Sequence, residues 1–524
     1  MNNTFESALK ATLNDECVLT ENGANAFATS GKALVDINFA VSSLRNASEN
    51  VIQKMYQDAF FENPLLATKW LFFARDIRGN GMAERRLFRI CLAWLANARP
   101  ELVKKLIPLV AEYGRFDDLF YAGLEGDLWD SIVDYVADKL KEDIDNANDG
   151  KPISLLAKWM PSVNTSSPKT RALAKKLRQS LGMDEKTYRK NLSTLRAKLK
   201  LVEVNASSGN WSEIDYNAVP SQANLKYKNA FLKHDEVRRK KYLADLEKPE
   251  SGEKINASAS FPCDIVAKYV QQSPNRWNPS FTLDSALEAM WKALPDYVAG
   301  NNDGSTIVVA DSSGSMDSPV SSSCTTALDV AFSLAIYFSE KLTGPFKDKW
   351  ITFSNKPKYV DMSNCKSLAD KLALAYSKAE VANTDLKKTF MLILKTAVDN
   401  NLKQEDLPSN VLLVSDMNFD QGTYQYNSYN ASKCALMKEI ADEFAKHGYK
   451  LPKIIYWNVI GGYDRKAPLP VQMNAEGAVL VSGFSPAIAK IVFSAKTNPY
   501  DVLVEALNTE RYQPVEDAFK SCEK

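Results

Sequence analysis

The chain has 524 residues, of which 45% are hydrophobic and 25% are charged, and its formal net charge is +1. These ordinary proportions exclude a low-complexity or intrinsically disordered protein, and a single core rarely extends beyond roughly 250–300 residues, so we expect two or more domains. The near-zero net charge gives no indication of a nucleic-acid partner unless the charges are distributed unevenly.

Particular residues and segments argue against several classes of protein. The first residues show no basic segment followed by an apolar run, and no stretch reaches the ~18 apolar residues that span a membrane. The seven cysteines are scattered without a CxxC pair, which is typical of a reducing compartment. We therefore expect a cytoplasmic protein without a membrane segment. With only His234 and His447 present, most zinc-hydrolase and Ser-His-Asp schemes lack their residues, so we expect a protein that is not an enzyme.

The first half of the chain, from about residue 25 to 247, has helical periodicity. Apolar residues recur at helical spacing over Asn63–Asp76, a second helix is expected from about Met82 to Ala98, and Pro100 opens a third. Helices of this length joined by short turns predict an all-α, HEAT-like helical repeat, which can also close into a ring. Trp70, Phe72 and Phe73 are expected in its core.

The periodicity changes after a turn at residues 299–304. Short apolar runs alternate with helical patterns, which predicts an α/β, doubly wound, Rossmann-like and mostly parallel sheet. We therefore expect two domains, at residues 1–298 and 299–524. The candidate strands are Thr306–Ala310, Trp350–Phe353, Val411–Val414, Ile454–Val459 and Ala478–Val481, and the candidate helices are Thr326–Lys341, Leu386–Val398 and Ala431–His447.

A D-x-S-x-S motif directly follows the first of these strands. Asp311, Ser313 and Ser315 can turn toward one pocket, because the chain bends just beyond a strand end, and Gly314 permits a tight turn. A carboxylate and two hydroxyls are hard oxygen donors that suit Mg²⁺, or another divalent cation such as Mn²⁺. The alternative is a simple turn, since Asp and Ser are common turn residues.

This motif resembles the metal-ion-dependent adhesion site of von Willebrand A domains. The resemblance implies two further ligands, a Thr from a downstream loop and an Asp after a later strand, and we assign Thr384 and Asp416 to them. Asp385 and Ser415 are the neighbouring alternatives. Such a site has few carboxylates, so the metal would take an anionic oxygen from a partner, and binding is favoured over catalysis.

A helical first half joined to a von Willebrand A domain resembles the Ro ribonucleoprotein family, whose helical ring is called the TROVE module. The stretches 72–81, 188–196, 211–221, 231–236 and 481–486 resemble a separate branch of TROVE-like proteins more closely than Ro itself. The resemblance implies a ribonucleoprotein scaffold whose helical half binds single-stranded ends or small structured RNA.

The charge distribution indicates the same partner. Residues 151–200 contain thirteen basic and two acidic residues, and such a stripe can neutralise phosphates and release counterions. Tyr188 is a candidate for stacking on an unpaired base. The residues we expect to contact RNA are Lys169, Arg171, Lys175, Lys176, Arg178, Arg189, Lys190 and Arg196.

Two alternatives stay open at this point. The stripe can be an ordinary solvated helix face, and the protein can be a metal-dependent protein–protein interaction module that binds no RNA. A second basic cluster, at Arg75, Arg78, Arg85, Arg86 and Arg89, is interpreted either as a functional surface or as local charge balance beside a turn.

Overall fold

The computed structural model divides into two compact units. The sheet unit comprises Met1–Leu66 and Ser260–Leu507, and the helical unit comprises Ala67–Ala259 and Asn508–Lys524. The residues that the structure describes are 17–20, 25–121, 126–275, 279–300, 305–320, 325–353, 356–379, 385–419, 435–459, 469–471, 473, 475–489, 493, 496 and 498–523.

This division differs from the expected boundary between residues 298 and 299. The beginning of the chain and residues 260–298 pack with the sheet, and the last residues pack with the helices. Periodicity reports how each segment folds locally, whereas side-chain packing between distant segments decides which of them share a core. The sequence pattern therefore did not predict that the N-terminal segment belongs to the sheet unit and the C-terminal segment to the helical unit.

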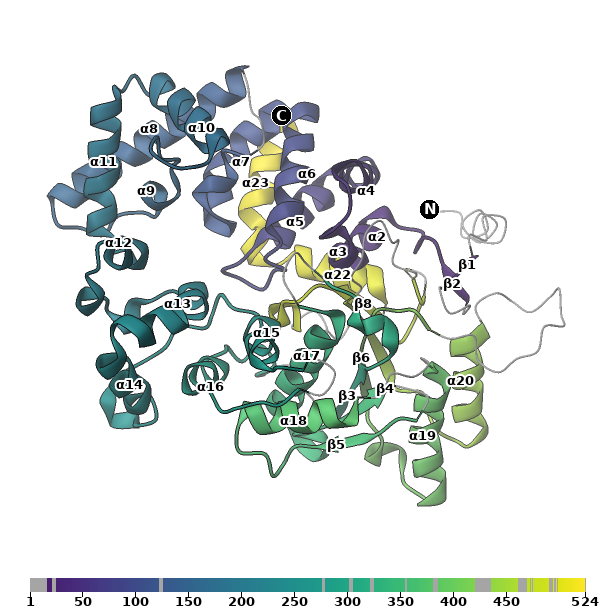
Figure 1. Ribbon diagram of the computed structural model, residues 1–524. Helices are drawn as coiled ribbons and strands as arrows, with labels where there is room; N and C mark the ends of the chain where they lie inside the picture. The colour runs from purple at the N-terminus through teal and green to yellow at the C-terminus, as the bar shows by residue number, and fades with distance from the viewer. Residues whose placement is uncertain are drawn as a thin grey trace. The chain divides into compact units, whose positions relative to one another are not determined.

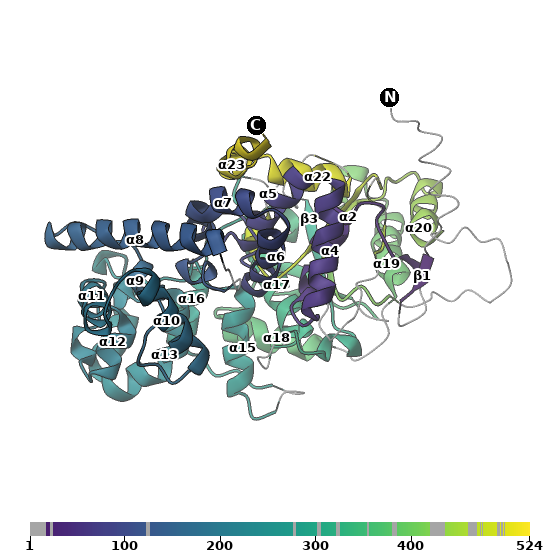
Figure 2. The same cartoon turned by 90° about the horizontal axis from the view of Figure 1, so that it is seen from above.

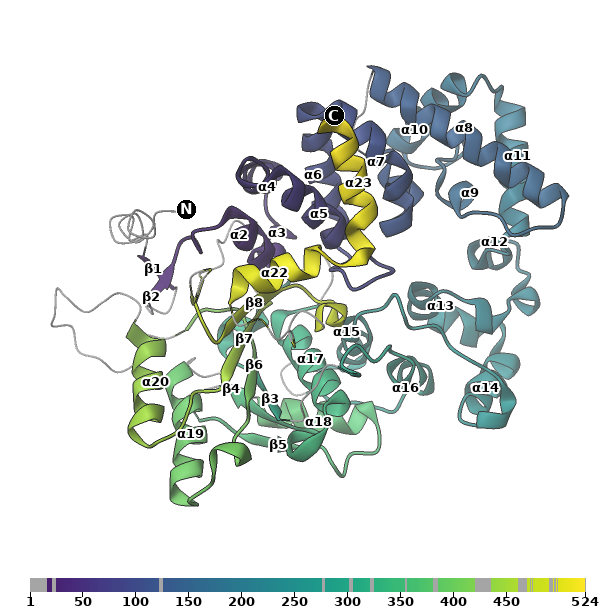
Figure 3. The same ribbon diagram turned by 180° about the vertical axis from the view of Figure 1, so that it is seen from behind.

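The sheet unit is built on six strands in the order β5-β4-β3-β6-β7-β8 (Figures 1 and 3). All neighbouring strands are parallel except the antiparallel pair β4 and β5. The five expected strands are present, each within one residue of its expected ends, and β5 was not anticipated. The strands are β3 (Thr306–Asp311), β4 (Lys349–Phe353), β5 (Tyr359–Asp361), β6 (Asn410–Ser415), β7 (Lys453–Asn458) and β8 (Ala478–Ser482).

The order of the strands creates a switch point between β3 and β6. From β3 the chain moves outward to β4 and β5, and it then returns to the other side of β3 to form β6, β7 and β8. Every residue of β3 is buried, which explains its continuous apolar and β-branched composition. In open α/β sheets, ligands bind beyond the carboxyl ends of the strands at such a switch point.

A central helix, α17 (Ala327–Lys341), packs against β3, β4 and β6. Thr326 and Asp329 form a capping box at its start, and nearly all of its residues are buried, as is typical of a helix enclosed on all sides. The other helices of the sheet unit are α2 (Ala33–Phe39), α3 (Val41–Leu44), α4 (Glu49–Glu62), α15 (Pro262–Gln272), α16 (Ser285–Lys292), α18 (Leu368–Lys378), α19 (Leu386–Asp399), α20 (Ala435–Lys446) and α22 (Pro499–Leu507).

The N-terminal segment joins the sheet through α2 and α3, after a short hairpin of β1 (Cys17–Leu19) and β2 (Asn25–Phe27). Ser42 Oγ donates to the carbonyl of Asn458 at 3.0 Å and accepts a hydrogen bond from the amide of Gly483 at 3.0 Å. Asn458 Nδ2 donates to the carbonyl of Phe39. These buried bonds satisfy backbone groups at the ends of β7 and β8, so the first residues of the chain complete this edge of the sheet.

The helical unit consists of successive helices that pack on their neighbours, as α6 does on α7 and α13 on α14. Trp70 and Phe72 are fully buried and Phe73 is 1% exposed, which confirms the expected core. Figure 2 shows α8 as one long straight helix. The helices are α5 (Pro64–Arg75), α6 (Arg85–Ala98), α7 (Pro100–Tyr113), α8 (Gly126–Asn148), α9 (Leu156–Trp159), α10 (Pro168–Ser180), α11 (Glu185–Lys198), α12 (Val202–Ser207), α13 (Ser221–His234), α14 (Glu236–Asp245) and α23 (Gln513–Glu523).

The coarse architecture is thus a helical first half followed by an α/β part with a mostly parallel sheet, as the sequence predicts. The HEAT-like, ring and von Willebrand A assignments stay predictions. In the part of the chain that is described, no helix combines the length and apolarity that crossing a membrane requires.

Candidate functional site

The two carboxylates that the sequence analysis selected lie at the switch point of the sheet. Asp311 is the last residue of β3, and Asp416 directly follows β6. Because Ala310 pairs with Val414 in the parallel register, Asp311 and Asp416 leave neighbouring strands at the same edge. The structure therefore brings these two residues together as the motif and the strand order predict.

Hydrogen bonds fix the loop that follows β3. The amide of Ser313 donates to Asp311 Oδ1 at 2.8 Å, and the hydroxyls of Ser313 and Ser315 are 3.1 Å apart. Ser415 Oγ donates to Asp311 Oδ2 at 2.6 Å. Asp311, Ser313, Ser315 and Asp416 thus form a compact group of oxygen donors.

The turn after β6 holds the second carboxylate in place. The amide and side-chain nitrogens of Asn418 both donate to Asp416 at 3.1 Å. Met417, between them, has a φ of 63° and is buried. A non-glycine residue in this left-handed region is strained, and such strain is concentrated at ligand sites and switch regions.

The electrostatics of the group fit a cation. Asp311 is fully buried and Asp416 is 3% exposed, and in the described part of the chain no Lys or Arg forms an ion pair with either of them. Burial and then the charge of Asp416 raise the pKa of Asp311 to about 7. Two buried carboxylates without a positive partner are costly, and a divalent cation with a preference for oxygen ligands would remove that cost.

Two further residues were considered as metal ligands, Thr384 as an expected ligand and Asp385 as an alternative. Thr384 lies outside the described residues. Asp385 caps α19, since its side chain accepts from the amide of Lys388 at 3.1 Å, which explains an Asp at that position without a metal. The described residues hold no cluster of three or more His, Cys, Asp or Glu side chains, and within them the two carboxylates at this edge are accompanied by the hydroxyls of Ser313 and Ser315.

The predicted basic stripe lies on α10 and α11 of the helical unit. Five of its eight members are exposed and, within the described residues, lie outside ion-pair distance of any carboxylate; a sixth, Lys176, is exposed and lies over the ring of Trp129 at 4.3 Å. Those five are Lys169, Arg171, Lys175, Arg189 and Lys190. Arg171 also donates to the carbonyls of Thr165 and Ser166, so part of its hydrogen-bonding capacity is used within the protein.

Two stripe residues have mainly structural contacts. Arg178 is half-buried and donates to the carbonyl of Met183 at 3.1 Å. Arg196 donates to the carbonyls of Ala157 and Met160 and to Ser162 Oγ, each at 2.8 Å, and burial lowers its pKa. These bonds fix the segment after α9, so Arg196 is a structural residue rather than an open phosphate contact.

The expectation that Tyr188 stacks on a base is wrong. Its ring is 1% exposed, and its hydroxyl donates to the carbonyl of Pro161 at 2.8 Å. Leu192 and Leu195 lie four and seven residues further along α11 and are also buried. Helical spacing therefore places Tyr188 on the apolar face of α11, and this signal was present in the sequence.

Three arginines of the second basic cluster bond to residues of the helical unit that are distant in sequence, so charge balance with their immediate neighbours does not account for them. Arg75 is buried and donates to Asp118 Oδ2 at 2.8 Å, and Arg89 donates to Asp118 Oδ1 at 2.5 Å. Arg78 donates to three carbonyls at the end of α7, those of Ala111, Glu112 and Gly114. For these three arginines the structure favours the interpretation that their charges hold neighbouring segments together.

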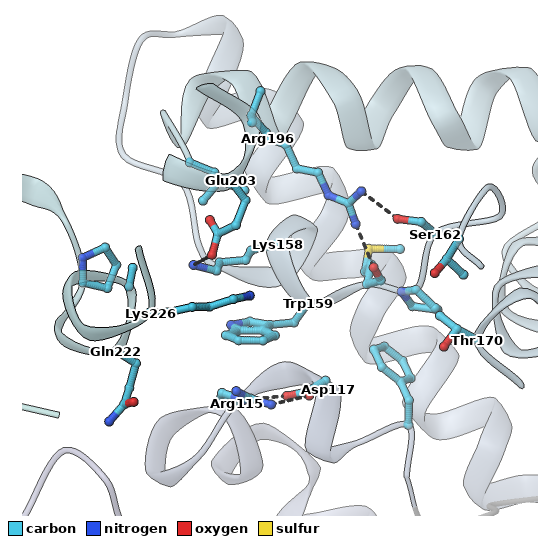
Figure 4. Close-up of a pocket in the computed structure, with 18 of the residues that line it drawn as sticks. Arg115, Asp117, Lys158, Trp159, Ser162, Thr170, Arg196, Glu203, Gln222 and Lys226 are labelled. Atoms are coloured by element: carbon cyan, nitrogen blue, oxygen red, sulfur yellow. Dashed lines mark hydrogen bonds and ion pairs between the residues drawn. The ribbon is translucent and has the colours of Figure 1, made fainter. Parts of the chain in front are cut away.

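A cavity of about 840 Å³ in the helical unit, around Trp159, was not predicted from the sequence (Figure 4). Four segments far apart in sequence form it, at residues 115–121, 158–173, 196–207 and 220–227, with Arg89 and Ala259. A lone Trp beside a Lys gives no signal of this kind, because only the tertiary structure brings the other segments to it.

Two family models match successive regions of the chain. A family model described as "Domain of unknown function (DUF7788)" matches residues 305–520, and one described as "Domain of unknown function (DUF2828)" matches residues 20–113 and 125–301. The chain is also similar to an uncharacterized protein of Acanthamoeba polyphaga mimivirus, with 28% identity over 95% of this chain and 88% of the relative. Since the DUF2828 match covers more than half of the residues, the chain belongs to the DUF2828 family.

Proposed function

We propose that this protein is a non-catalytic RNA-binding scaffold, in which the helical unit binds single-stranded ends or small structured RNA. The observation that carries the proposal is the exposed basic surface of α10 and α11, in a chain whose overall charge is only +1. Cations without acidic partners retain their full attraction for phosphates, and RNA binding releases the counterions that surround the RNA. The resemblance to the Ro family supports the same partner.

A fluorescence-anisotropy titration with labelled single-stranded RNA at several salt concentrations tests this function. The triple variant K175Q/R189Q/K190Q should bind several-fold more weakly, and the slope of log affinity against log salt should fall by about 2, since each lost phosphate contact on a single strand contributes about 0.7. A matched triple variant, K366Q/K395Q/K403Q, removes three exposed charges from the sheet unit and should bind like the wild type. Equal losses in both variants would indicate a non-specific charge effect and would contradict the proposal.

The sheet unit is proposed to hold Mg²⁺, or another divalent cation such as Mn²⁺, through Asp311, Ser313, Ser315 and Asp416, with Thr384 as the fifth ligand. Bound there, the cation supplies a Lewis-acidic position that accepts an anionic oxygen of a partner. Asp311 and Asp416 would hold the charge of the cation, and Ser313 and Ser315 would provide neutral ligands.

A second candidate function, a metal-dependent protein–protein interaction module without RNA binding, is favoured by this same pair of carboxylates. A pull-down in the presence of Mg²⁺ or EDTA separates the two functions. Under the second function, Asp311→Ala abolishes partner capture and the wild type shows no affinity for RNA. Under the first, Asp311→Ala leaves the affinity for RNA unchanged, because the basic surface belongs to the other unit.

A further inference from the structure

The cavity around Trp159 lies beside η1 (Phe116–Asp118), α9, α12 and α13 of the helical unit. Its volume of about 840 Å³ falls within the range of about 300–1,000 Å³ that is typical of ligand sites. The basic side chains that line it are Arg89, Arg115, Lys158, Arg196 and Lys226, and the acidic ones are Asp117 and Glu203.

Trp159 presents a flat aromatic surface in this cavity. The guanidinium of Arg115 lies 3.8 Å from the centroid of the indole ring, and Arg115 is held in turn by Asp117, to which it donates at 2.8 and 2.6 Å. In Figure 4, Arg115 and Asp117 lie on one side of the indole, and Lys226 extends toward it from the other side. One face of the ring is thus supported by Arg115, which Asp117 holds in place, and Lys158 Nζ also lies over the ring, 5.5 Å from its centroid.

The cations that line the cavity differ in whether a carboxylate lies close enough to pair with them. Arg89 and Arg115 both pair with Asp117, and Lys158 is 3.9 Å from Glu203. Lys226 is exposed, and among the described residues no carboxylate lies within ion-pair distance of it. It is therefore the cation most available to an anionic ligand.

Three aromatic side chains besides Trp159 line the cavity, those of Phe120, Tyr121 and Tyr227. Tyr121 is 51% exposed, and the guanidinium of Arg89 lies 4.8 Å from its ring centroid. Large exposed aromatic side chains lose contact with water when a flat ligand covers them. Aromatic faces interleaved with cations match a ligand that has both a planar ring and a negative charge.

We propose that this cavity binds an unpaired nucleotide of single-stranded RNA, with its base stacked on Trp159 and its phosphate near Lys226. The inference rests on the proposed RNA-binding function and assigns that function a second contact region besides α10 and α11. Proteins that bind single strands combine basic grooves with aromatic side chains on which bases stack. A phosphorylated peptide would use the cations but would leave the indole without a planar partner.

Anisotropy titrations of the full chain with a labelled oligouridylate, and with an abasic oligomer of the same length and charge, test the inference. Trp159→Leu should weaken binding of the oligouridylate about tenfold, the order expected for a lost stacking contact, and Trp159→Phe should recover part of the loss. Both variants should bind the abasic oligomer as the wild type does. Circular dichroism and thermal unfolding check that the variants are folded.

Lys226→Gln tests the phosphate contact at an exposed position where folding is not at risk. It should weaken binding of both oligomers several-fold. Lys233→Gln is the matched control, because Lys233 is exposed on the same helix, α13, two turns further along, and does not line the cavity. It should bind like the wild type.

The outcomes separate this inference from the function on which it rests. If the wild type binds RNA and K175Q/R189Q/K190Q weakens binding while the Trp159 and Lys226 variants do not, the cavity proposal is overturned and the proposed function stands. If Trp159→Leu weakens binding of the abasic oligomer as much as binding of the oligouridylate, the base contact is overturned. If the wild type binds neither oligomer, both proposals fail.

Discussion

Ser415 and Asp311 form a buried hydrogen bond between the two strands at the switch point of the sheet, with Ser415 Oγ donating to Asp311 Oδ2 at 2.6 Å. The same hydroxyl accepts a hydrogen bond from the amide of Met417 at 3.0 Å, in the strained turn that carries Asp416. One side chain thus connects both carboxylates of the candidate metal site. Ser415 is better understood as a positioning residue than as the ligand that the sequence analysis kept as an alternative.

Replacing Ser415 with Ala should weaken Mg²⁺ binding about tenfold while the fold is retained. Groups that orient metal ligands through hydrogen bonds typically contribute 10- to 100-fold to metal affinity. Isothermal titration calorimetry with Mg²⁺ and Mn²⁺ gives the comparison. Ser333→Ala is the control, since among the described residues this buried hydroxyl bonds within α17 alone, to the carbonyl of Val330. Equal affinities for wild type and Ser415→Ala would contradict the positioning role.

Mg²⁺ should raise the melting temperature of the wild type and leave Asp311→Asn unaffected. A ligand at 100 times its dissociation constant stabilises the folded state by about 2.7 kcal/mol. Asp311→Asn removes a ligand charge and also relieves its repulsion of Asp416, so the metal-free variant should unfold at a temperature no lower than that of the metal-free wild type. Asp361→Asn, at an exposed carboxylate on β5, should retain the full Mg²⁺ response. An identical response in Asp311→Asn would place the cation elsewhere.

The sheet was predictable because its strands are short, continuously apolar runs. Val411–Val414 and Thr306–Ala310 carry this signal within a few residues, and the position of a polar motif at a strand end follows from it. β5, by contrast, has only three residues with an exposed-buried-exposed pattern, which is too short to distinguish from a loop. Asp311 and Asp416 could be paired because the α/β order determines which strand ends meet.

The candidate functional residues of the helical unit were harder to predict than those at the strand ends of the sheet unit. Charge counting identified the surface of α10 and α11, but it could not separate Lys175, which is exposed, from Arg196, whose nitrogens bind backbone carbonyls. A guanidinium has five donors and often bonds to the protein itself, which a count of charges does not register. The cavity around Trp159 is formed by segments from four parts of the chain, so no local sequence pattern predicts it.

Asp117 should make the helical unit sensitive to acid. Burial raises its pKa, but hydrogen bonds from Arg115 and Arg89 and their charges outweigh burial and lower the pKa overall; the charged neighbours that face it are Arg85, Arg89, Arg115 and Asp118. A carboxyl with a lowered folded-state pKa contributes stability that is present above its unfolded value, near 4, and is lost as the pH falls through the folded value.

Urea unfolding at pH 7 and at pH 3 measures this contribution. Asp117→Asn should be less stable than the wild type at pH 7, and the difference should shrink at pH 3, which lies below the unfolded-state pKa near 4. Asp130→Asn, at an exposed residue of α8, is the control. A difference that grows toward low pH has the wrong sign and would contradict the assignment.

Arg511 should be essential for attaching the C-terminal segment to the helical unit. It donates to both oxygens of Asp76, at 2.9 and 3.0 Å, and Asp76 is fully buried. Arg511→Met leaves this carboxylate without its cation. Breaking a fully buried pair in this way costs about 3–5 kcal/mol, and because the Arg511 side chain is 31% exposed we expect a loss below that range. The free energy of unfolding in urea gives the measurement.

Arg99 provides the matched comparison, because it pairs with Glu523 of the same C-terminal segment at 2.9 Å, but on the surface, with both side chains more than one-third exposed. Exposed pairs contribute about 0–1 kcal/mol, so Arg99→Met should change the stability little. If both substitutions have the same small effect, the segment is held by apolar contacts, such as the edge-to-face packing of Tyr512 on Phe73, rather than by the charge of Arg511.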